Sequence, residues 1–361
     1  MSLKAITESA IELLEALIAT PSFSGEEERT AELISDWLTD HGVKIRRSKN
    51  SVIAENNFSD PSKPYLLLNS HHDTVKPNNA YVKDPFKPEH SEGKLFGLGS
   101  NDAGGALVSL LATFLHFYDR DDLPFNLLMV ASAEEETAGP NSLRGLLAEL
   151  PPIELAIVGE PTQMQLAIAE KGLMVYDAVI SGTPSHAAHP NDDNPIYKCI
   201  EVLSWFKQLN FERNSEMLGA VKTTVTQISA GKQHNVVPAA VNLVVDIRVT
   251  DAYTNEEIDA YFQANAPCQM TPRSFHLRSS GIEKSHPLVQ AGIALGRETY
   301  GSPTLSDQAA LSCKSMKMGP GDSLRSHQAD EFICIHEIEE AIPLYIKLLE
   351  SFFIQLKTKT L

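Results

Sequence analysis

The stretch YLLLNSHHD, residues 65–73, joins an apolar run to a His-x-Asp step. A short apolar run bounded by polar residues is typical of a buried strand. In an open parallel sheet, ligands bind outside the carboxyl ends of the strands. His71 and Asp73 follow the run directly, so they are the first candidates for a functional site.

Four further features, acidic or imidazole, lie at the ends of predicted elements or in loops. They are Asp102 at a glycine-rich helix start, the triplet Glu134-Glu135-Glu136, Glu160 after the run 156–158, and His327 in a Gly/Pro-rich loop. Zinc binds neutral imidazole nitrogen and carboxylate oxygen, so this collection predicts a metal site built by the fold. Taken singly, each residue also fits a solvated surface position, and Asp102 fits a helix cap.

The first portion of the chain alternates strand-like and helical patterns, which predicts an α/β layer structure. Ser24 and Glu27 have the spacing of a capping box that opens a helix over Glu28–His41, and Gly42 ends that helix. The other predicted elements are a surface helix within 2–20, a helix over Ala103–Tyr118, and strands at Ser51–Glu55, Tyr65–Asn69, Phe125–Ala131 and Leu155–Val158.

The pattern changes after Lys171-Gly172 to the order β-α-β-β-α-β, which is typical of a ferredoxin-like sandwich. Strands are predicted at Leu173–Ile180, Val221–Ser229, Asn242–Val249 and Ser274–Leu277, with helices at Pro195–Leu209 and Asn255–Ala264. The α/β pattern resumes near Ile282. We therefore predict a catalytic domain formed by residues 1–172 and 282–361, interrupted by an inserted domain at 173–281.

Composition limits the partners and the location of the protein. The 361 residues carry a formal net charge of −17, which argues against binding to nucleic acid or to an anionic membrane. The first helix carries acidic residues and is not a signal peptide, and no transmembrane helix is predicted. Four widely spaced cysteines form no metal-binding spacing. We expect a soluble cytoplasmic protein with reduced cysteines.

The order and spacing of the motifs, taken together, are more specific than any one motif. The chain resembles the dizinc aminoacylase and carboxypeptidase superfamily that includes acetylornithine deacetylase and succinyl-diaminopimelate desuccinylase. The matching stretches run nearly end to end: 20–26, 70–75, 97–102, 134–136, 159–162, 182–190, 235–238, 246–248, 306–307 and His327. The resemblance implies a zinc-peptidase-like catalytic domain, with a mixed and mostly parallel sheet flanked by helices, and an inserted ferredoxin-like lid and dimerisation domain.

The resemblance also implies a ligand set for two divalent metal ions, zinc or alternatively cobalt. Asp102 bridges the two ions, His71 and Glu160 complete one site, and Glu136 and His327 complete the other. Two such ions lie about 3.5–4 Å apart and share a carboxylate and a water.

Roles beyond the ligands follow from the same pattern. Glu135 is the general base, although a shift of the triplet by one residue is the main alternative. Asp73 is expected to accept the second ring N–H of His71 and fix its tautomer, whereas His72 faces the opposite way and is not a ligand. His186 is expected to polarise the scissile carbonyl in the active site of the other subunit of a homodimer, with His189 as the nearer competitor.

Lys171, Asn235 and Arg248 are candidates for binding substrate carboxylates, although Arg248 next to Asp246 also fits a surface ion pair. Two departures from the family pattern limit the substrate. Asp102 is followed by Ala-Gly-Gly where many relatives have Met-Lys-Gly. Glu170-Lys171-Gly172 stands where desuccinylases often carry an Arg pair, which weakens a desuccinylase assignment.

The sequence therefore predicts a metal-dependent amidohydrolase that removes a small acyl group, acetyl or succinyl, from an amino acid. The expected substrates are N-acetylornithine or an N-acylated ornithine or citrulline of arginine biosynthesis. The alternatives are succinyl-diaminopimelate desuccinylase, a dipeptidase or carboxypeptidase, and a non-catalytic metal-dependent binding protein.

Overall fold

The computed structural model describes residues 2–359, which fall into two units. Unit 1 contains the described residues of Met1–Ile168, Gly281–Tyr300 and Ser306–Leu361, and unit 2 contains Ala169–Ser280 and Gly301–Leu305. None of the helices in the described part of the chain has the length and apolar composition of a membrane span.

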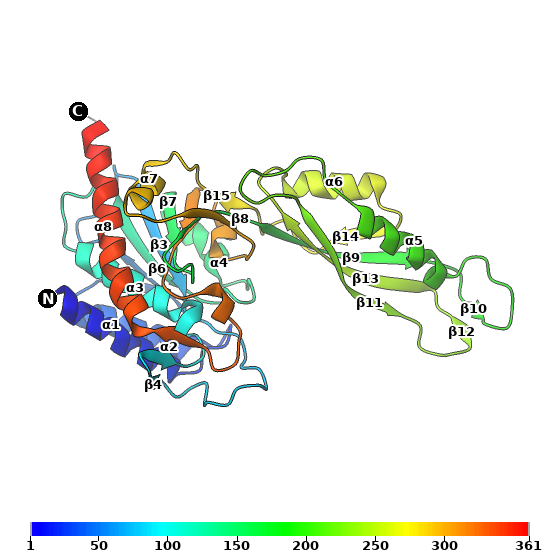
Figure 1. Ribbon diagram of the computed structural model, residues 1–361, viewed down its shortest axis with the longest axis horizontal. Helices are drawn as coiled ribbons and strands as arrows, with labels where there is room; N and C mark the ends of the chain where they lie inside the picture. The colour runs from blue at the N-terminus through cyan, green and yellow to red at the C-terminus, as the bar shows by residue number, and fades with distance from the viewer. Residues whose placement is uncertain (1, 360–361) are drawn as a thin grey trace. The chain divides into compact units, whose positions relative to one another are not determined.

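A nine-stranded mixed sheet forms the centre of unit 1 (Figure 1). Its order is β1 (Ile45–Ser48), β2 (Ser51–Glu55), β6 (Asn126–Ser132), β3 (Tyr65–His71), β7 (Ile153–Val158), β17 (Lys314–Lys317), β8 (Leu166–Glu170) and β15 (Ser280–Gly281), with β16 (Thr299–Ser302) paired to β8. Strand β3 runs parallel to both β6 and β7, and β7 runs parallel to β17. The predicted α/β class with a mostly parallel centre is confirmed.

Helices pack beside this sheet and supply much of the core. Helix α3 (Gly105–Phe117) is buried along nearly its whole length and packs against α1 (Leu3–Ile18) and α8 (Ile335–Lys359), as Figure 1 shows. The remaining helices of unit 1 are α2 (Glu28–Asp40), α4 (Leu143–Leu146) and α7 (Pro287–Ala294), with short helical turns at Ser100–Gly104, Leu147–Glu149, Asp307–Ala310 and Ser323–Arg325. A small sheet has the order β18 (Phe332–Cys334), β5 (Lys94–Phe96) and β4 (Glu89–Ser91).

The predicted capping box before α2 is wrong. The residue that precedes the helix is Glu27, and it makes no side-chain cap. The hydroxyl of Ser24 instead donates to Asp73 Oδ2 at 2.7 Å. A local cap contributes about 1 kcal/mol, whereas a hydrogen bond to a charged group contributes roughly 1.5–3 kcal/mol. Ser24 therefore bonds Asp73 instead of capping α2.

Unit 2 has the predicted β-α-β-β-α-β order. Its antiparallel sheet is ordered β11 (Lys222–Ala230), β13 (Ala240–Val249), β9 (Gly172–Ser181) and β14 (Gln269–Pro272). Helices α5 (Pro195–Gln208) and α6 (Asn255–Asn265) contribute Phe206 and Phe262 to a core shared with Tyr176 of β9. A separate ribbon pairs β10 (Ser185–His186) with β12 (Val236–Val237).

The fourth strand of unit 2 lies earlier than the predicted Ser274–Leu277. It is β14, which begins four residues after α6 ends and pairs with β9. Strand β14 ends at Pro272, and proline cannot donate a hydrogen bond to a neighbouring strand. Strand β14 lies at the edge of the sheet, where a proline is tolerated.

Candidate active site

Three parallel strands deliver site residues to one edge of the central sheet. Strand β3 ends at His71, which pairs in register with Ser132, the last residue of β6. The glutamate triplet follows β6 after one residue, and Glu160 follows the end of β7 at Val158. Because these strands are parallel, their carboxyl ends lie together.

Asp102 lies between two histidines that come from distant parts of the chain. His71 Nε2 is 3.4 Å from Asp102 Oδ1 and 3.9 Å from Glu160 Oε1. His327 Nε2 is 3.6 Å from Asp102 Oδ2 and 3.1 Å from each carboxylate oxygen of Glu136. The five predicted ligands are therefore brought together, with the two oxygens of Asp102 directed at different histidines.

Asp73 holds both the first histidine and the glutamate turn. His71 Nδ1 lies 3.0 Å from the backbone carbonyl oxygen of Asp73 and 3.3 Å from its Oδ1. The same carboxylate accepts the backbone N–H groups of Glu135 at 3.0 Å and Glu136 at 3.1 Å. One buried aspartate thus fixes the ring of His71 and the start of the turn that carries the triplet.

The three glutamates of the triplet have different surroundings. Glu134 is buried and has a positive φ of 54°. Its carboxylate accepts the backbone and side-chain N–H groups of Asn141 at 2.9 and 2.6 Å. The carboxylate of Glu136 lies against His327. Glu135 stands between them in sequence, and its backbone N–H donates to Asp73 Oδ1 at 3.0 Å.

His72 is separated from this cluster by its hydrogen bonds. Its ring nitrogens lie 2.9 Å from Thr30 Oγ1 and 3.0 Å from the carbonyl oxygen of Asn50. Burial lowers the pKa of His72 to about 4, so the ring is neutral at pH 7. His72 therefore serves the packing of α2 and the loop before β2.

Comparison with known proteins places the chain in a family. Residues 67–351 match Peptidase family M20/M25/M40. The chain belongs to this family. It is 28% identical to acetylornithine deacetylase of Proteus mirabilis over 97% of this chain and 98% of that protein. It is 26% identical to succinyl-diaminopimelate desuccinylase of Helicobacter pylori over 95% of this chain and 98% of that protein.

A solved structure confirms the fold of this M20-family chain. A dinuclear metal-binding M20 peptidase from Bacillus subtilis superposes with a TM-score of 0.73 at 18% identity, covering 97% of this chain and 99% of that one. Membership in the M20 family makes the protein a hydrolase of the amidohydrolase and peptidase type.

The clustered side chains of the site have the chemistry of ligands for divalent metal ions. Ligand atoms of His71, Asp102 and Glu136 all lie within 4.8 Å of one another. Imidazole nitrogen and carboxylate oxygen are the donors that zinc accepts. Several carboxylates packed around two imidazoles also carry an excess of negative charge, which a cation offsets.

Electrostatics distinguish the two histidines and the proposed base. Burial alone would lower the pKa of His71, but the carboxylates of Asp102 and Asp73 raise it well above its usual range. The Glu136 carboxylate raises the pKa of His327 to about 9. Burial raises the pKa of Glu135 well above its usual range, with Glu160, Asp307 and Glu136 adding to the effect and His71 opposing it.

Four other predicted residues lie in unit 2 of the M20-family chain. His186 is an exposed residue of β10, and the exposed Asn235 directly precedes β12. The carbonyl of Asn235 accepts the N–H of Ala187 at 3.0 Å. Arg248 is paired with Asp246 through two hydrogen bonds of 3.0 and 3.2 Å. Lys171 Nζ donates to the carbonyl of Ala220 at 3.0 Å.

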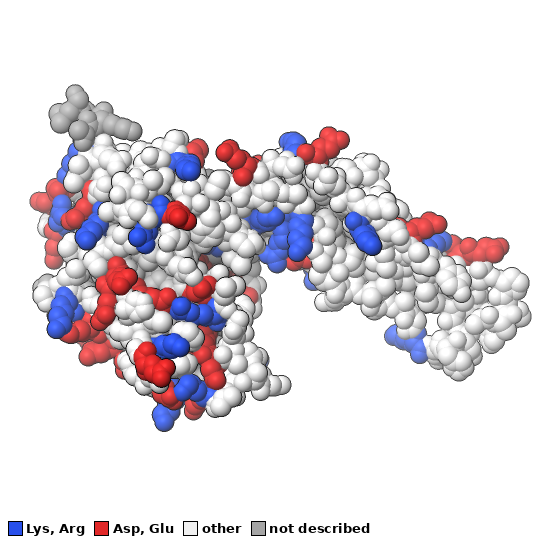
Figure 2. Space-filling model, in the orientation of Figure 1, with Lys and Arg blue, Asp and Glu red and all other residues white. Residues whose placement is uncertain are grey.

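Basic residues gather around Lys171 in unit 2. Burial lowers the pKa of Lys171, and the nearby charges of Lys222 and Arg248 add to the effect. Lys222 is the direct cross-strand neighbour of Arg248, so both side chains leave the same face of the sheet. This cluster contrasts with the many acidic side chains visible on unit 1 in Figure 2.

Sequence reasoning assigned no role in the site to three buried acids that lie next to it. Glu27 accepts the backbone N–H of Glu134 at 3.1 Å, and Asp307 accepts a hydrogen bond from Ser132 at 2.5 Å. Glu331 accepts the N–H of Asp102 at 2.9 Å. The only signal for Glu331 was its position four residues after His327, and Glu27 had been interpreted as part of a helix cap.

Proposed function

We propose that the protein is a zinc-dependent amidohydrolase that removes an acetyl or succinyl group from the α-nitrogen of ornithine or citrulline, in the cytoplasm and within arginine biosynthesis. The observation that carries this proposal is the convergence of His71, Asp102, Glu136, Glu160 and His327 beside Glu135. The near full-length likeness to acetylornithine deacetylase supports the choice of substrate.

Two bound divalent ions would polarise the amide carbonyl and acidify the attacking water. His71, Asp102 and Glu160 would hold one ion, and His327, Glu136 and Asp102 the other. Cobalt is an alternative to zinc in the same ligand set.

Glu135 acts as the general base in this proposal. Burial raises the pKa of Glu135, and a carboxylate of raised pKa is the stronger base that accepts a proton from the attacking water and then donates it to the leaving amine. Asp73 supports both parts of the site, because it orients His71 and holds the N–H groups of Glu135 and Glu136. A base without this support would sample unproductive positions.

Substrate carboxylates are assigned to unit 2. Arg248, whose guanidinium can bind a carboxylate through two N–H groups, and Asn235 are proposed to hold the α-carboxylate. Lys171 is proposed to meet the second carboxylate of a succinyl group. An unpaired carboxylate in a closed site would cost several kcal/mol, so a succinyl substrate requires such a partner.

Unit 2 is also proposed to form a homodimer. Helix α5 exposes Ile196, Tyr197 and Ile200 at 44%, 70% and 65%. Strand β11 lies at the sheet edge and exposes Ile228 at 59%. An unpaired edge next to apolar side chains is a surface that a second copy can cover.

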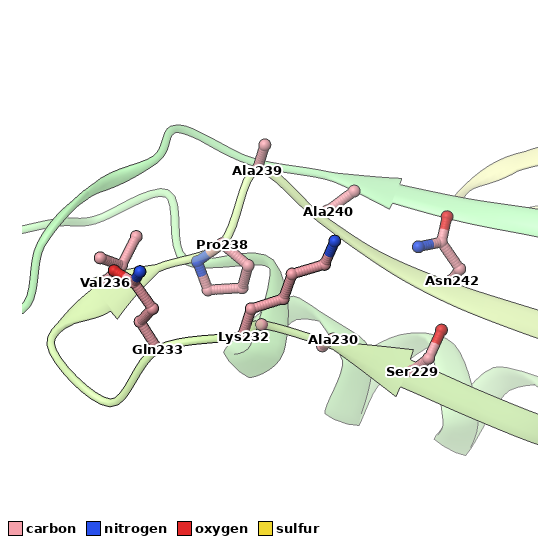
Figure 3. Close-up of a pocket in the computed structure, with 10 residues that line it drawn as sticks. Ser229, Ala230, Lys232, Gln233, Val236, Pro238, Ala239, Ala240 and Asn242 are labelled. Carbon is pink, nitrogen blue, oxygen red and sulfur yellow. The ribbon is translucent and has the colours of Figure 1, made fainter.

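A groove beside the same edge strand extends this surface. It has a volume of about 550 Å³ and is lined by the end of β11, Val236, Pro238 and the start of β13 (Figure 3). The loop that borders it contains Asn235 and pairs with the segment of His186. We propose that His186 acts across the dimer and stabilises the oxyanion in the partner's active site.

The alternatives predict different substrates. A desuccinylase would prefer succinyl-diaminopimelate, a dipeptidase or carboxypeptidase would cleave unblocked peptides, and a metal-dependent binding protein would turn over none of them. Measuring kcat/KM across acylated amino acids and dipeptides tests the proposal.

A further inference from the structure

Glu331 is a buried acid without a role in the proposed reaction. Its side chain is only 2% exposed, and its carboxylate accepts three backbone N–H groups. Oε1 receives those of Asn101 at 2.8 Å and Asp102 at 2.9 Å, and Oε2 receives that of Gly99 at 3.1 Å. A single acid thus accepts three N–H groups of the turn that carries Asp102.

A buried carboxylate destabilises the fold unless its oxygens accept hydrogen bonds. Removing a carboxylate from water is unfavourable, and several charge-assisted hydrogen bonds are needed to offset it. The N–H groups of the first residues of a helix otherwise lack partners within the helix. Glu331 therefore replaces the usual local cap with an acid from a segment more than 200 residues away.

The side chain of Asn101 fastens the same turn to the segment before His327. Its Nδ2 donates to the carbonyl of Asp322 at 3.1 Å, and its Oδ1 accepts the N–H of Asp322 at 3.0 Å. A Cβ on Gly321 would lie 2.4 Å from Asn101 Oδ1, so the approach requires glycine there. Contacts at Asp322 and Glu331 therefore bracket His327 in the sequence.

We infer that Glu331 is a positioning residue that orients Asp102 between His71 and His327 and thereby sets the affinity of the site for divalent ions. It acts through the backbone of residues 99–102 and touches no reacting atom. This inference rests on the ligand set of the proposed function. Outer residues of this kind commonly change metal affinity by about 10- to 100-fold.

The test compares metal binding by apo-protein variants. Glu331→Gln keeps the shape of the side chain but replaces one acceptor oxygen with an N–H₂ group that faces a backbone donor. We expect the Kd for Co²⁺, measured by calorimetry and by the visible absorption of the bound ion, to rise by about 10- to 100-fold. Glu331→Asp keeps the carboxyl group but shortens its reach, and an intermediate increase is expected.

Asn126→Asp is the matched control. Asn126 is also fully buried, and its side chain bonds Asp60 and Lys63 at the amino end of β6, the end of the strand opposite the site. This isosteric change should lower the thermal unfolding temperature and leave the Co²⁺ Kd unchanged.

Two results would overturn the inference. One is a wild-type Kd for Co²⁺ in both Glu331 variants, and the other is an equal loss of affinity in Asn126→Asp. If Asp102→Ala weakens binding while the Glu331 variants do not, the inference alone fails. If the wild-type protein binds no Co²⁺ pair, the proposed function fails with it.

Discussion

His327 Nε2 lies 3.1 Å from both carboxylate oxygens of Glu136, although the two residues are 191 positions apart in the chain. This contact joins the loop after β17 to the turn after β6. It places an imidazole and a carboxylate as neighbours beside Asp102, whose Oδ2 lies 3.6 Å from His327 Nε2.

The first prediction concerns metal content. The wild-type protein should bind two divalent ions per chain, because the two carboxylate oxygens of Asp102 face different histidines. His71→Ala and His327→Ala should each lose one ion and most of the activity, as elemental analysis of the purified variants would reveal. His72→Ala is the control, since His72 is bonded to Thr30 and Asn50, and it should keep both ions. Full occupancy in both ligand variants would refute the ligand set.

The second prediction separates the base from its neighbour in the triplet. Glu135→Gln should retain both ions and lower kcat by at least about 100-fold, the lower end of general acid–base contributions. Glu136→Gln should instead weaken metal binding, because its carboxylate meets His327. Steady-state kinetics and metal analysis of both variants would check this. Reversed phenotypes would mean that the roles in the triplet are shifted by one residue.

Much of the fold was predictable from local patterns. The strand at Tyr65–Asn69 is a short apolar run, and its parallel neighbours β6 and β7 are apolar runs as well. The sequence therefore predicts the central sheet and the polar residues at the carboxyl ends of its strands. Most of the five clustered side chains lie at or after the end of a strand or helical turn, and this position is visible in the sequence.

The parts that failed depend on distant partners. Ser24 fits a helix cap in sequence, but its partner Asp73 is 49 residues away. The fourth strand of unit 2 contains Pro272, which only an edge position tolerates. Glu331 has no local motif at all, because its hydrogen bonds go to backbone N–H groups that any sequence supplies.

A third prediction addresses the dimer. His186→Ala and Glu135→Gln subunits should each be nearly inactive alone. Mixed under conditions that allow subunit exchange, they should regain part of the activity, because a hybrid dimer contains one site with both an intact base and a partner's His186. His189→Ala mixed with Glu135→Gln is the comparison that tests the neighbouring histidine. Proven exchange without recovery would contradict action across the dimer.

The fourth prediction assigns the two carboxylate contacts. Arg248→Ala should raise KM for all acylated amino acids alike, because every one of them has an α-carboxylate. Lys171→Ala should raise KM for succinyl substrates more than for acetyl ones. Arg273→Ala is the control, since Arg273 is an exposed residue of unit 2 that pairs with Asp177 at 2.8 Å, and its KM values should not change. Equal effects of Lys171→Ala on both acyl groups would remove its assigned role.

The most direct test of the proposed function is kcat/KM of the zinc-loaded protein on a matched panel. The panel contains the N-acetyl and N-succinyl derivatives of ornithine and citrulline, N-succinyl-diaminopimelate, and unblocked dipeptides. We predict the highest kcat/KM for an ornithine or citrulline derivative and poor cleavage of the dipeptides. Faster hydrolysis of a dipeptide, or of succinyl-diaminopimelate over every ornithine and citrulline derivative, would contradict the account.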